Sequence, residues 1–161
     1  MKIDLQQLRK EPVILDVRLE SAFLEADIEE GLRFDAAEGT VTFRLAGENV
    51  LATGRLDSRV HGVCARCLGP ASRDIHADVM LNYWPKTGHE ESKIAEITPD
   101  EPDYVLFDGF EIEPDDDLRQ LVVIEAPGIL TCADDCRGIC PACGANLNLK
   151  PCQCKTKEDA E

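Results

Sequence analysis

Apolar and polar residues alternate over several stretches of this chain, and the alternation predicts strands. Within residues 13–19 every second residue is apolar, the period of a strand with one buried face. The same period recurs over residues 41–45 and, after a Gly-Glu-Asn turn, the chain continues toward Cys64. The clearest alternation covers residues 75–83. These segments predict an antiparallel sheet with Cys64 and Cys67 at a hairpin tip.

One helix is predicted after the sheet. Pro114 and the acids that follow it favour a helix start, and the pattern ends near Glu125, before Pro127. Residues 21–30 leave a helix and an irregular strand both open, and residues 104–107 predict a short strand. The side chains expected to pack the helix onto the sheet are Leu118, Leu121, Val122 and Ile124. The fold class is therefore α+β, mainly antiparallel β, with an open or barrel-like sheet and one packed helix.

The periodic pattern of apolar residues stops after Ile129, and this predicts that the chain has a folded body followed by a region of a different kind. Residues 1–128 predict the β body, with an acidic, proline-containing loop at about 85–103. Residues 129–154 are rich in Cys, Gly, Pro and Asn and offer little apolar area for a core, so another force must fold them. Residues 155–161 form a polar tail.

Charge and composition argue against some functional classes and favour others for this chain. The formal net charge of -15 argues against a protein that coats nucleic acid, because phosphate binding relies on clustered Lys and Arg. Thirteen acids lie within residues 89–125, against two cations. We interpret them first as a solvated acidic loop and second as a patch for a basic partner. No apolar run of membrane-spanning length and no secretory signal is found, so we expect a cytoplasmic protein with reduced cysteines.

Eight cysteines occur at spacings typical of metal ligands: Cys64, Cys67, Cys132, Cys136, Cys140, Cys143, Cys152 and Cys154. Four thiolates complete the tetrahedron that zinc prefers in structural sites, so eight ligands suffice for two closed sites. The strongest signal is the knuckle at residues 138–144, where Pro stiffens the loop and Gly lets backbone amides turn toward the sulfurs. We expect two structural zinc ions that help to fold residues 129–154.

Spacing alone leaves the ligand partition open. The preferred grouping places the last four cysteines in a local C-terminal site and leaves the first four to join residues 129–154 to the hairpin tip. A redox role for Cys64 and Cys67, or for Cys140 and Cys143, is the alternative, because a Cys-x-x-Cys pair can cycle between dithiol and disulfide. An iron–sulfur cluster is also chemically open, although the knuckle spacing favours zinc.

Other polar residues near the cysteines have simpler interpretations. Four cations lie within or beside the cysteine runs, where they would neutralise the sulfurs or contact phosphates: Arg66, Arg137, Lys150 and Lys155. Neutralisation is preferred, given the overall acidity. The histidines His61, His76 and His89 are interpreted as ordinary surface or sheet positions. No nucleophile with a recognisable base and no Gly-rich phosphate loop is found, so no catalytic residue is predicted.

The cysteine motifs resemble those of a known family. Residues 63–68 (VCARCL), 132–144 (CADDCRGICPACG) and 146–148 (NLN) together resemble the YceD family of large ribosomal RNA subunit accumulation proteins. The resemblance implies a role in the synthesis, processing or stability of large-subunit (23S) ribosomal RNA. Only the cysteines map cleanly, and no RNA-contacting residue follows from it.

We therefore expect a non-enzymatic ribosome-biogenesis factor rather than an enzyme. Its partner would be ribosomal RNA, a large-subunit ribosomal protein or an assembly factor, with no membrane and no small-molecule substrate. Two alternatives remain: a thiol-based redox protein, and a zinc-binding protein-interaction module unrelated to ribosomes.

Overall fold

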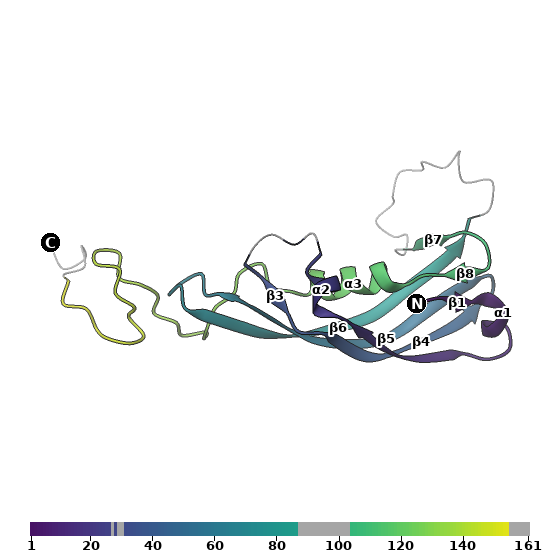
Figure 1. The fold of residues 1–161 in the computed structure, drawn as a ribbon, viewed down its shortest axis with the longest axis horizontal. Helices are drawn as coiled ribbons and strands as arrows, with labels where there is room; N and C mark the ends of the chain where they lie inside the picture. Colours follow the sequence, from purple (N-terminus) through teal and green to yellow (C-terminus); the bar gives the residue numbers. More distant parts are fainter. Residues whose placement is uncertain (27, 29–30, 87–103, 155–161) are drawn as a thin grey trace.

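The computed structural model describes residues 1–26, 28, 31–86 and 104–154. A long curved sheet carries one helix along a face, and residues 129–154, here called the cysteine region, extend past one end of the sheet (Figure 1). In chain order the elements are β1 (Ile3–Asp4), α1 (Leu5–Leu8), β2 (Val13–Leu19), α2 (Ser21–Leu24), β3 (Arg33–Phe34), β4 (Ala37–Ala46), β5 (Asn49–Val63), β6 (Pro70–Pro85), β7 (Val105–Phe107), β8 (Glu111–Ile112) and α3 (Asp115–Ile124).

The main sheet has the order β2-β4-β5-β6-β7, and β3 pairs with β5. All of these pairings are antiparallel except β6–β7, which is parallel. The α+β class and the mainly antiparallel sheet are thus confirmed. The barrel-like closure that the sequence left open is wrong, because β2 and β7 are the two ends of the pairing order and do not pair with each other. The short strand predicted at residues 104–107 is confirmed as β7, but its parallel direction was not predicted, since periodicity carries no information on strand direction.

Alternation along β4, β5 and β6 separates the two faces of the sheet. One face buries an apolar core under α3, and the other bears cross-strand pairs of charged residues such as Arg55 with Asp78. The side chains with no exposed surface include Val41, Phe43, Val50, Leu56 and Val60. Burying such side chains is the main favourable term in folding a sheet of this kind.

Two glycines allow β4 and β5 to approach closely. A Cβ atom on Gly54 would lie 2.2 Å from the carbonyl oxygen of Thr40, and one on Gly39 would lie 1.9 Å from that of Arg55. Neither distance is sterically possible, so each position requires a residue without a side chain. These glycines therefore fix the local geometry of the hairpin.

Helix α3 covers the core face, as the sequence predicted. Leu118 and Val122 are fully buried, and Leu121 packs beside them. The prediction that Ile124 also packs on the sheet is wrong, because its side chain is 75% exposed. It lies six residues beyond Leu118, which at about 100° per residue turns it to the solvent side of the helix.

The short elements α2, β1 and β8 complete the comparison with the sequence predictions. Residues 21–24 form one turn of helix, which favours the helix alternative for the start of residues 21–30; residues 27, 29 and 30 lie outside the described residues. The small sheet of β1 and β8 was not predicted, because strands of two residues show no period. The acidic loop, apart from Pro85 and Lys86, and the polar tail lie outside the described residues. Within the described part of the chain, no helix is long and apolar enough to cross a bilayer.

Candidate metal centres

The β5–β6 hairpin places the first Cys-x-x-Cys pair at its tip, as predicted. Val63 pairs with Pro70, and the turn beyond them is closed by hydrogen bonds from Cys64 N to Gly69 O (2.7 Å) and from Leu68 N to Cys64 O (2.9 Å). Leu68 adopts a left-handed conformation with φ 57°. The turn thereby brings the side chains of Cys64 and Cys67 into one cluster.

The cysteine region is attached to this tip by one buried side chain. Leu130 is 4% exposed, and its Cδ1 atom lies 2.7 Å from where a Cβ on Gly62 would be. The amide of Ala65 donates to the carbonyl of Leu130 at 2.9 Å. A side chain at position 62 would therefore force Leu130 to move from this packed position, which favours glycine there.

Two arginines of the hairpin add polar contacts to the same junction. The guanidinium of Arg66 donates to the carbonyls of Asp134 (3.0 Å) and Cys136 (3.3 Å). Arg73 forms an ion pair with the carboxylate of Asp134 at 2.6 Å. These contacts hold Cys132 and Cys136 close to the hairpin tip.

The first group of four thiols, here called the inner cluster, is the result: Cys64, Cys67, Cys132 and Cys136. Its four sulfurs lie within 4.8 Å of one another, with Cys64 and Cys136 at 3.8 Å and Cys67 and Cys132 at 3.6 Å. Sulfurs placed about 2.3 Å from a tetrahedral zinc ion would be about 3.8 Å apart. The residues present therefore fit a closed four-thiolate site.

The second group, here called the outer cluster, comprises Cys140, Cys143, Cys152 and Cys154. A tight turn forms its knuckle: Cys140 N donates to Ala145 O at 2.8 Å, and Gly144 N donates to Cys140 O at 2.9 Å. Gly144 has φ 70°, which favours glycine. The four sulfurs again lie within 4.8 Å of one another. The structure thus groups the eight cysteines as the preferred partition did.

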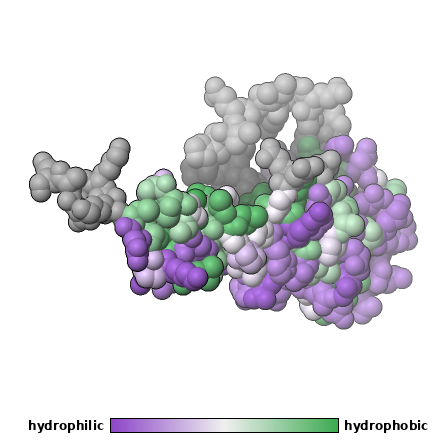
Figure 2. All heavy atoms as spheres, turned by 60° about the vertical axis from the view of Figure 1, so that its left-hand side comes forward, coloured by the Kyte–Doolittle hydropathy of each residue, from purple (hydrophilic) through white to green (hydrophobic). Residues whose placement is uncertain are grey.

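The two clusters differ in burial. Three of the four inner cysteines are buried, whereas Cys140 is the one buried member of the outer cluster. Exposed apolar side chains are frequent at this end of the molecule: Val63, Leu68, Ile129, Ile139 and Leu149. Figure 2, with this end turned forward, shows green hydrophobic surface beside purple polar surface there. Because three of its four cysteines are not buried, the outer cluster is the more solvent-accessible of the two.

Backbone amides lower the pKa of one thiol most strongly in each cluster. Amides of Cys67 and Cys132 donate to the Cys64 sulfur and lower its pKa to about 6. Amides of Cys143 and Ala142 lower the pKa of Cys140 to about 7. Hydrogen bonds to neighbouring sulfurs raise the pKa of Cys132 and of Cys154 to about 12. Each cluster therefore contains a thiol that favours the thiolate form and one that disfavours it, and a bound cation would stabilise the thiolate form of both.

The predicted cations lie around the clusters in different ways. Arg66 bonds to backbone carbonyls, as described above, so it joins the two chain segments. The side chains of Arg137 and Lys150 have no ion pair or hydrogen bond within the described part of the chain. Lys155 lies outside that part. Neutralisation of sulfur and phosphate contact both stay predictions for these residues.

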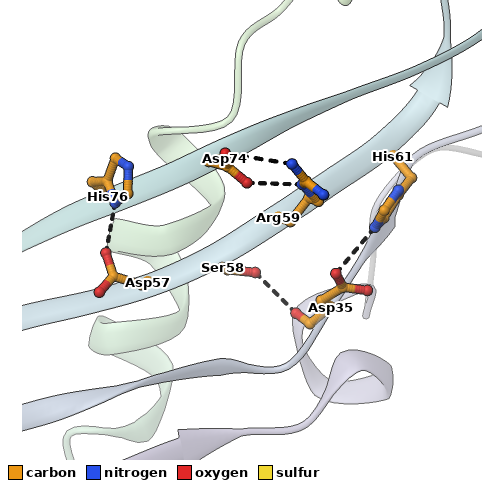
Figure 3. Close-up of polar contacts among 7 residues, drawn as sticks. All are labelled: Asp35, Asp57, Ser58, Arg59, His61, Asp74 and His76. Atoms are coloured by element: carbon orange, nitrogen blue, oxygen red, sulfur yellow. Dashed lines mark hydrogen bonds and ion pairs between the residues drawn. The ribbon is translucent and has the colours of Figure 1, made fainter.

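The histidines that the structure describes contact acidic side chains of the sheet region and not the cysteines. His61 lies 3.1 Å from Asp35, and His76 lies 2.6 Å from Asp57, beside the Arg59–Asp74 pair (Figure 3). Neither belongs to a cluster. This agrees with their interpretation as ordinary sheet positions, and His89 lies outside the described residues.

Sequence reasoning missed three residues of the site. Leu130 and Gly62 form the junction with the sheet, and Asn148 donates to the sulfur of Cys136 at 3.3 Å. No local pattern could pair Gly62 with Leu130, because they are far apart in the sequence. Asn148 belongs to the Asn-Leu-Asn motif that the family resemblance included, but the motif gives no contact.

The sheet is open and mainly antiparallel, the tip of its β5–β6 hairpin contributes to one group of four thiols, and the cysteine region holds a second. These features define a cysteine-cluster protein with two candidate metal centres. The family model for the large ribosomal RNA subunit accumulation protein YceD matches residues 52–161, which include both clusters. The chain therefore belongs to the YceD family, as its motifs predicted.

Curated relatives add little about function. Uncharacterized proteins of Mycobacterium bovis and of two strains of Mycobacterium tuberculosis are 32% identical to the chain over 108 residues. The matched region is 65% of this chain and 48% of each relative, so the chain spans about half the length of the curated relatives it matches. No solved structure matches the chain significantly.

Proposed function

We propose that this protein is a non-enzymatic factor that supports the synthesis, processing or stability of large-subunit (23S) ribosomal RNA. The single observation that carries the proposal is the family match, which covers most of β5, all of β6 and α3, and all eight cysteines. The family's printed description concerns accumulation of large-subunit ribosomal RNA. The part of the chain that carries the match is thus also the part that bears both clusters.

Two zinc ions complete the proposal. Among the residues that the structure describes, each cluster offers four sulfurs and no other ligand, which is the donor set of structural zinc. A closed set leaves no coordination position for a water molecule or a substrate, and this supports a structural role. When bound, each ion would supply folding free energy to a segment with little apolar core.

Binding, rather than catalysis, is the proposed activity. The hairpin tip and the cysteine region present exposed apolar side chains, such as Leu68 at the tip and Leu149 in the cysteine region, which are 65% and 80% exposed. Exposed apolar groups of this kind are typical of interaction surfaces. The net charge of -15 favours a large-subunit ribosomal protein or assembly factor as the direct contact over bare ribosomal RNA.

Deletion and complementation test the function. Bacteria that lack the family member should accumulate less 23S relative to 16S ribosomal RNA, and the intact chain should restore the ratio. A chain with Cys64→Ser and Cys67→Ser should restore it poorly, whereas the surface variant Met80→Ala should restore it fully. An unchanged ratio in the deletion strain would contradict the proposal.

Sedimentation identifies the class of partner. The chain should co-sediment with large-subunit precursors and stay with their proteins after RNase treatment. Release by RNase would assign the contact to RNA instead. If the chain never enters ribosomal fractions, direct action in assembly is contradicted, and an interaction module unrelated to ribosomes becomes the better hypothesis.

A thiol-based redox protein is the second candidate, and one observation favours it. The pKa of about 6 for Cys64 would make this thiol largely anionic at neutral pH, as reactive cysteines are. Native protein would then react rapidly with a thiol reagent without a chelator. Slow reaction that becomes fast only after chelation would reject this candidate.

A further inference from the structure

One side chain connects the two clusters. Asn148 lies in the outer loop, between Cys143 and Cys152, yet its amide nitrogen donates to the sulfur of Cys136 in the inner cluster at 3.3 Å. Its amide oxygen accepts from the backbone N–H of Arg137 at 2.8 Å. Both polar atoms of Asn148 are thus used at the inner cluster or directly beside it.

The outer loop fixes the position of this side chain. Asn146 Oδ1 accepts from both the backbone N–H and the side-chain amide of Asn148, at 2.9 and 3.0 Å. Asn146 in turn pairs with Ile139 in an isolated bridge, and Leu147 N donates to Gly138 O at 2.9 Å. The orientation of Asn148 therefore depends on a loop that the outer cysteines close.

An N–H group that donates to a metal-bound thiolate offsets part of its negative charge and fixes its orientation. Partners of this kind around a metal site change metal affinity by about 10- to 100-fold. Of the four inner sulfurs, Cys136 is the one that receives a side-chain amide, and the donor comes from the loop of the other cluster. The two clusters are thereby joined by a hydrogen bond as well as by the chain.

We propose that Asn148 is a positioning residue that couples the two metal centres. Closure of the outer cluster around its ion holds Asn148 against the Cys136 sulfur, and this slows loss of the inner ion. Because coupling between binding sites is reciprocal, the inner ion also strengthens binding at the outer cluster. The inference rests on the proposed metal sites.

Cysteine-resolved alkylation of the full, zinc-loaded chain tests the coupling. The chain is mixed with a chelator and an alkylating reagent, then digested with trypsin. Cleavage after Arg137 separates the peptides of the inner cysteines from the peptide of the outer cysteines. The rate of labelling is thus measured for each cluster separately.

In the Asn148→Ala chain, the reagent should label the inner cysteines about 10-fold faster than in the unaltered chain. Asn148→Asp should label them at least as fast, because it keeps the oxygen that bonds to Arg137 but loses the donor to sulfur. The matched control is Asn82→Ala on β6, whose neighbour Leu51 lies at the end of β5 remote from the hairpin tip, and it should change nothing.

A background in which Cys152 and Cys154 are both replaced by Ser sharpens the test. There the outer loop no longer holds Asn148, so the inner cysteines should already be labelled fast, and adding Asn148→Ala should have no further effect. A full effect of Asn148→Ala in this background would overturn the coupling, since it would show a purely local role.

The remaining outcomes separate this inference from the metal proposal. If the zinc-loaded variants label the inner cysteines at the unaltered rate, the coupling is overturned while both metal centres stand. The same holds if only the outer cysteines are labelled faster. A chain that binds no zinc would instead overturn the metal centres themselves.

Discussion

The sheet and the cysteine region are stabilised by different interactions. In the sheet, side chains such as Phe43 and Leu56 have no exposed surface and pack into one core. Between residues 129 and 154, Leu130 is the one buried aliphatic side chain, and the other buried side chains are those of Cys136 and Cys140. The comparison teaches that hydrophobic burial accounts for the sheet, whereas the cysteine region has little such burial and would be stabilised by the proposed ligand bonds to a metal.

Metal removal should give the largest difference in stability between the sheet and the cysteine region. Structural zinc contributes about 10–16 kcal/mol of apparent binding free energy in small zinc modules, and the cysteine region has little else to order it. Hydrogen exchange after chelation should therefore become fast over residues 132–154 and stay slow in β4, β5 and β6. Simultaneous loss of protection in both regions would contradict the difference.

A cavity in the core should destabilise the sheet rather than the cysteine region. Phe43→Ala removes a fully buried ring and should lower the free energy of unfolding by about 3–5 kcal/mol. Urea unfolding followed by the fluorescence of Trp84, the one tryptophan of the chain, measures this change. Phe110→Ala, at a ring that is 69% exposed, is the matched control and should change stability by less than about 0.5 kcal/mol.

The same substitution should leave thiol protection in the folded protein unchanged, because the inner cluster lies beyond the hairpin tip. Labelling of Cys64 in the Phe43→Ala chain, below the urea transition, checks this expectation. Fast labelling there would show that the core and the inner cluster are not independently stabilised.

Backbone packing between β4 and β5 should give a smaller effect. Gly54→Ala places a Cβ atom 2.2 Å from the Thr40 carbonyl oxygen, so the strands must separate, at a cost of about 1–3 kcal/mol. Gly128→Ala is the control, because no heavy atom lies within 4 Å of its added Cβ. Equal urea midpoints for the two variants would be inconsistent with the close approach of the strands.

The smallest expected effect is a difference between the pH values at which the two clusters lose their metal. Acid releases metal by protonating the thiolates, and protons reach exposed ligands more readily. Three of the four outer cysteines are exposed or partly exposed, whereas Cys132 is the one exposed inner cysteine. The outer cluster should therefore lose its metal at a higher pH than the inner cluster. Cysteine-resolved alkylation after brief exposure to each pH measures the order, and the reverse order would refute this account.

Sequence periodicity predicted the sheet well where one face is buried. The strand at residues 13–19 has the predicted bounds, and the hairpin tip at Cys64 is confirmed. The period of two residues fixes which side chains share a face but not the direction of a neighbouring strand, so the parallel β7 and the open sheet needed coordinates. Ile124 was misplaced because the helix was assigned more apolar contacts than one face can provide.

The cysteine grouping followed from spacing and from the hairpin, since neighbours in the sequence share a turn. The Asn148–Cys136 and Gly62–Leu130 contacts did not follow, because each joins segments whose relative position depends on the fold. Long-range contacts between irregular segments have no periodic signal in a sequence. The grouping of the cysteines was thus predictable, but the contacts around them were not.

Native mass spectrometry of the intact chain, purified without chelators, tests the central claim most directly, because it counts bound metal and thiol protons together. The account predicts a mass increase that corresponds to about two zinc ions, each bound with loss of the thiol protons it displaces. A metal-free mass, or one reduced by the hydrogens lost in disulfide formation, would contradict it.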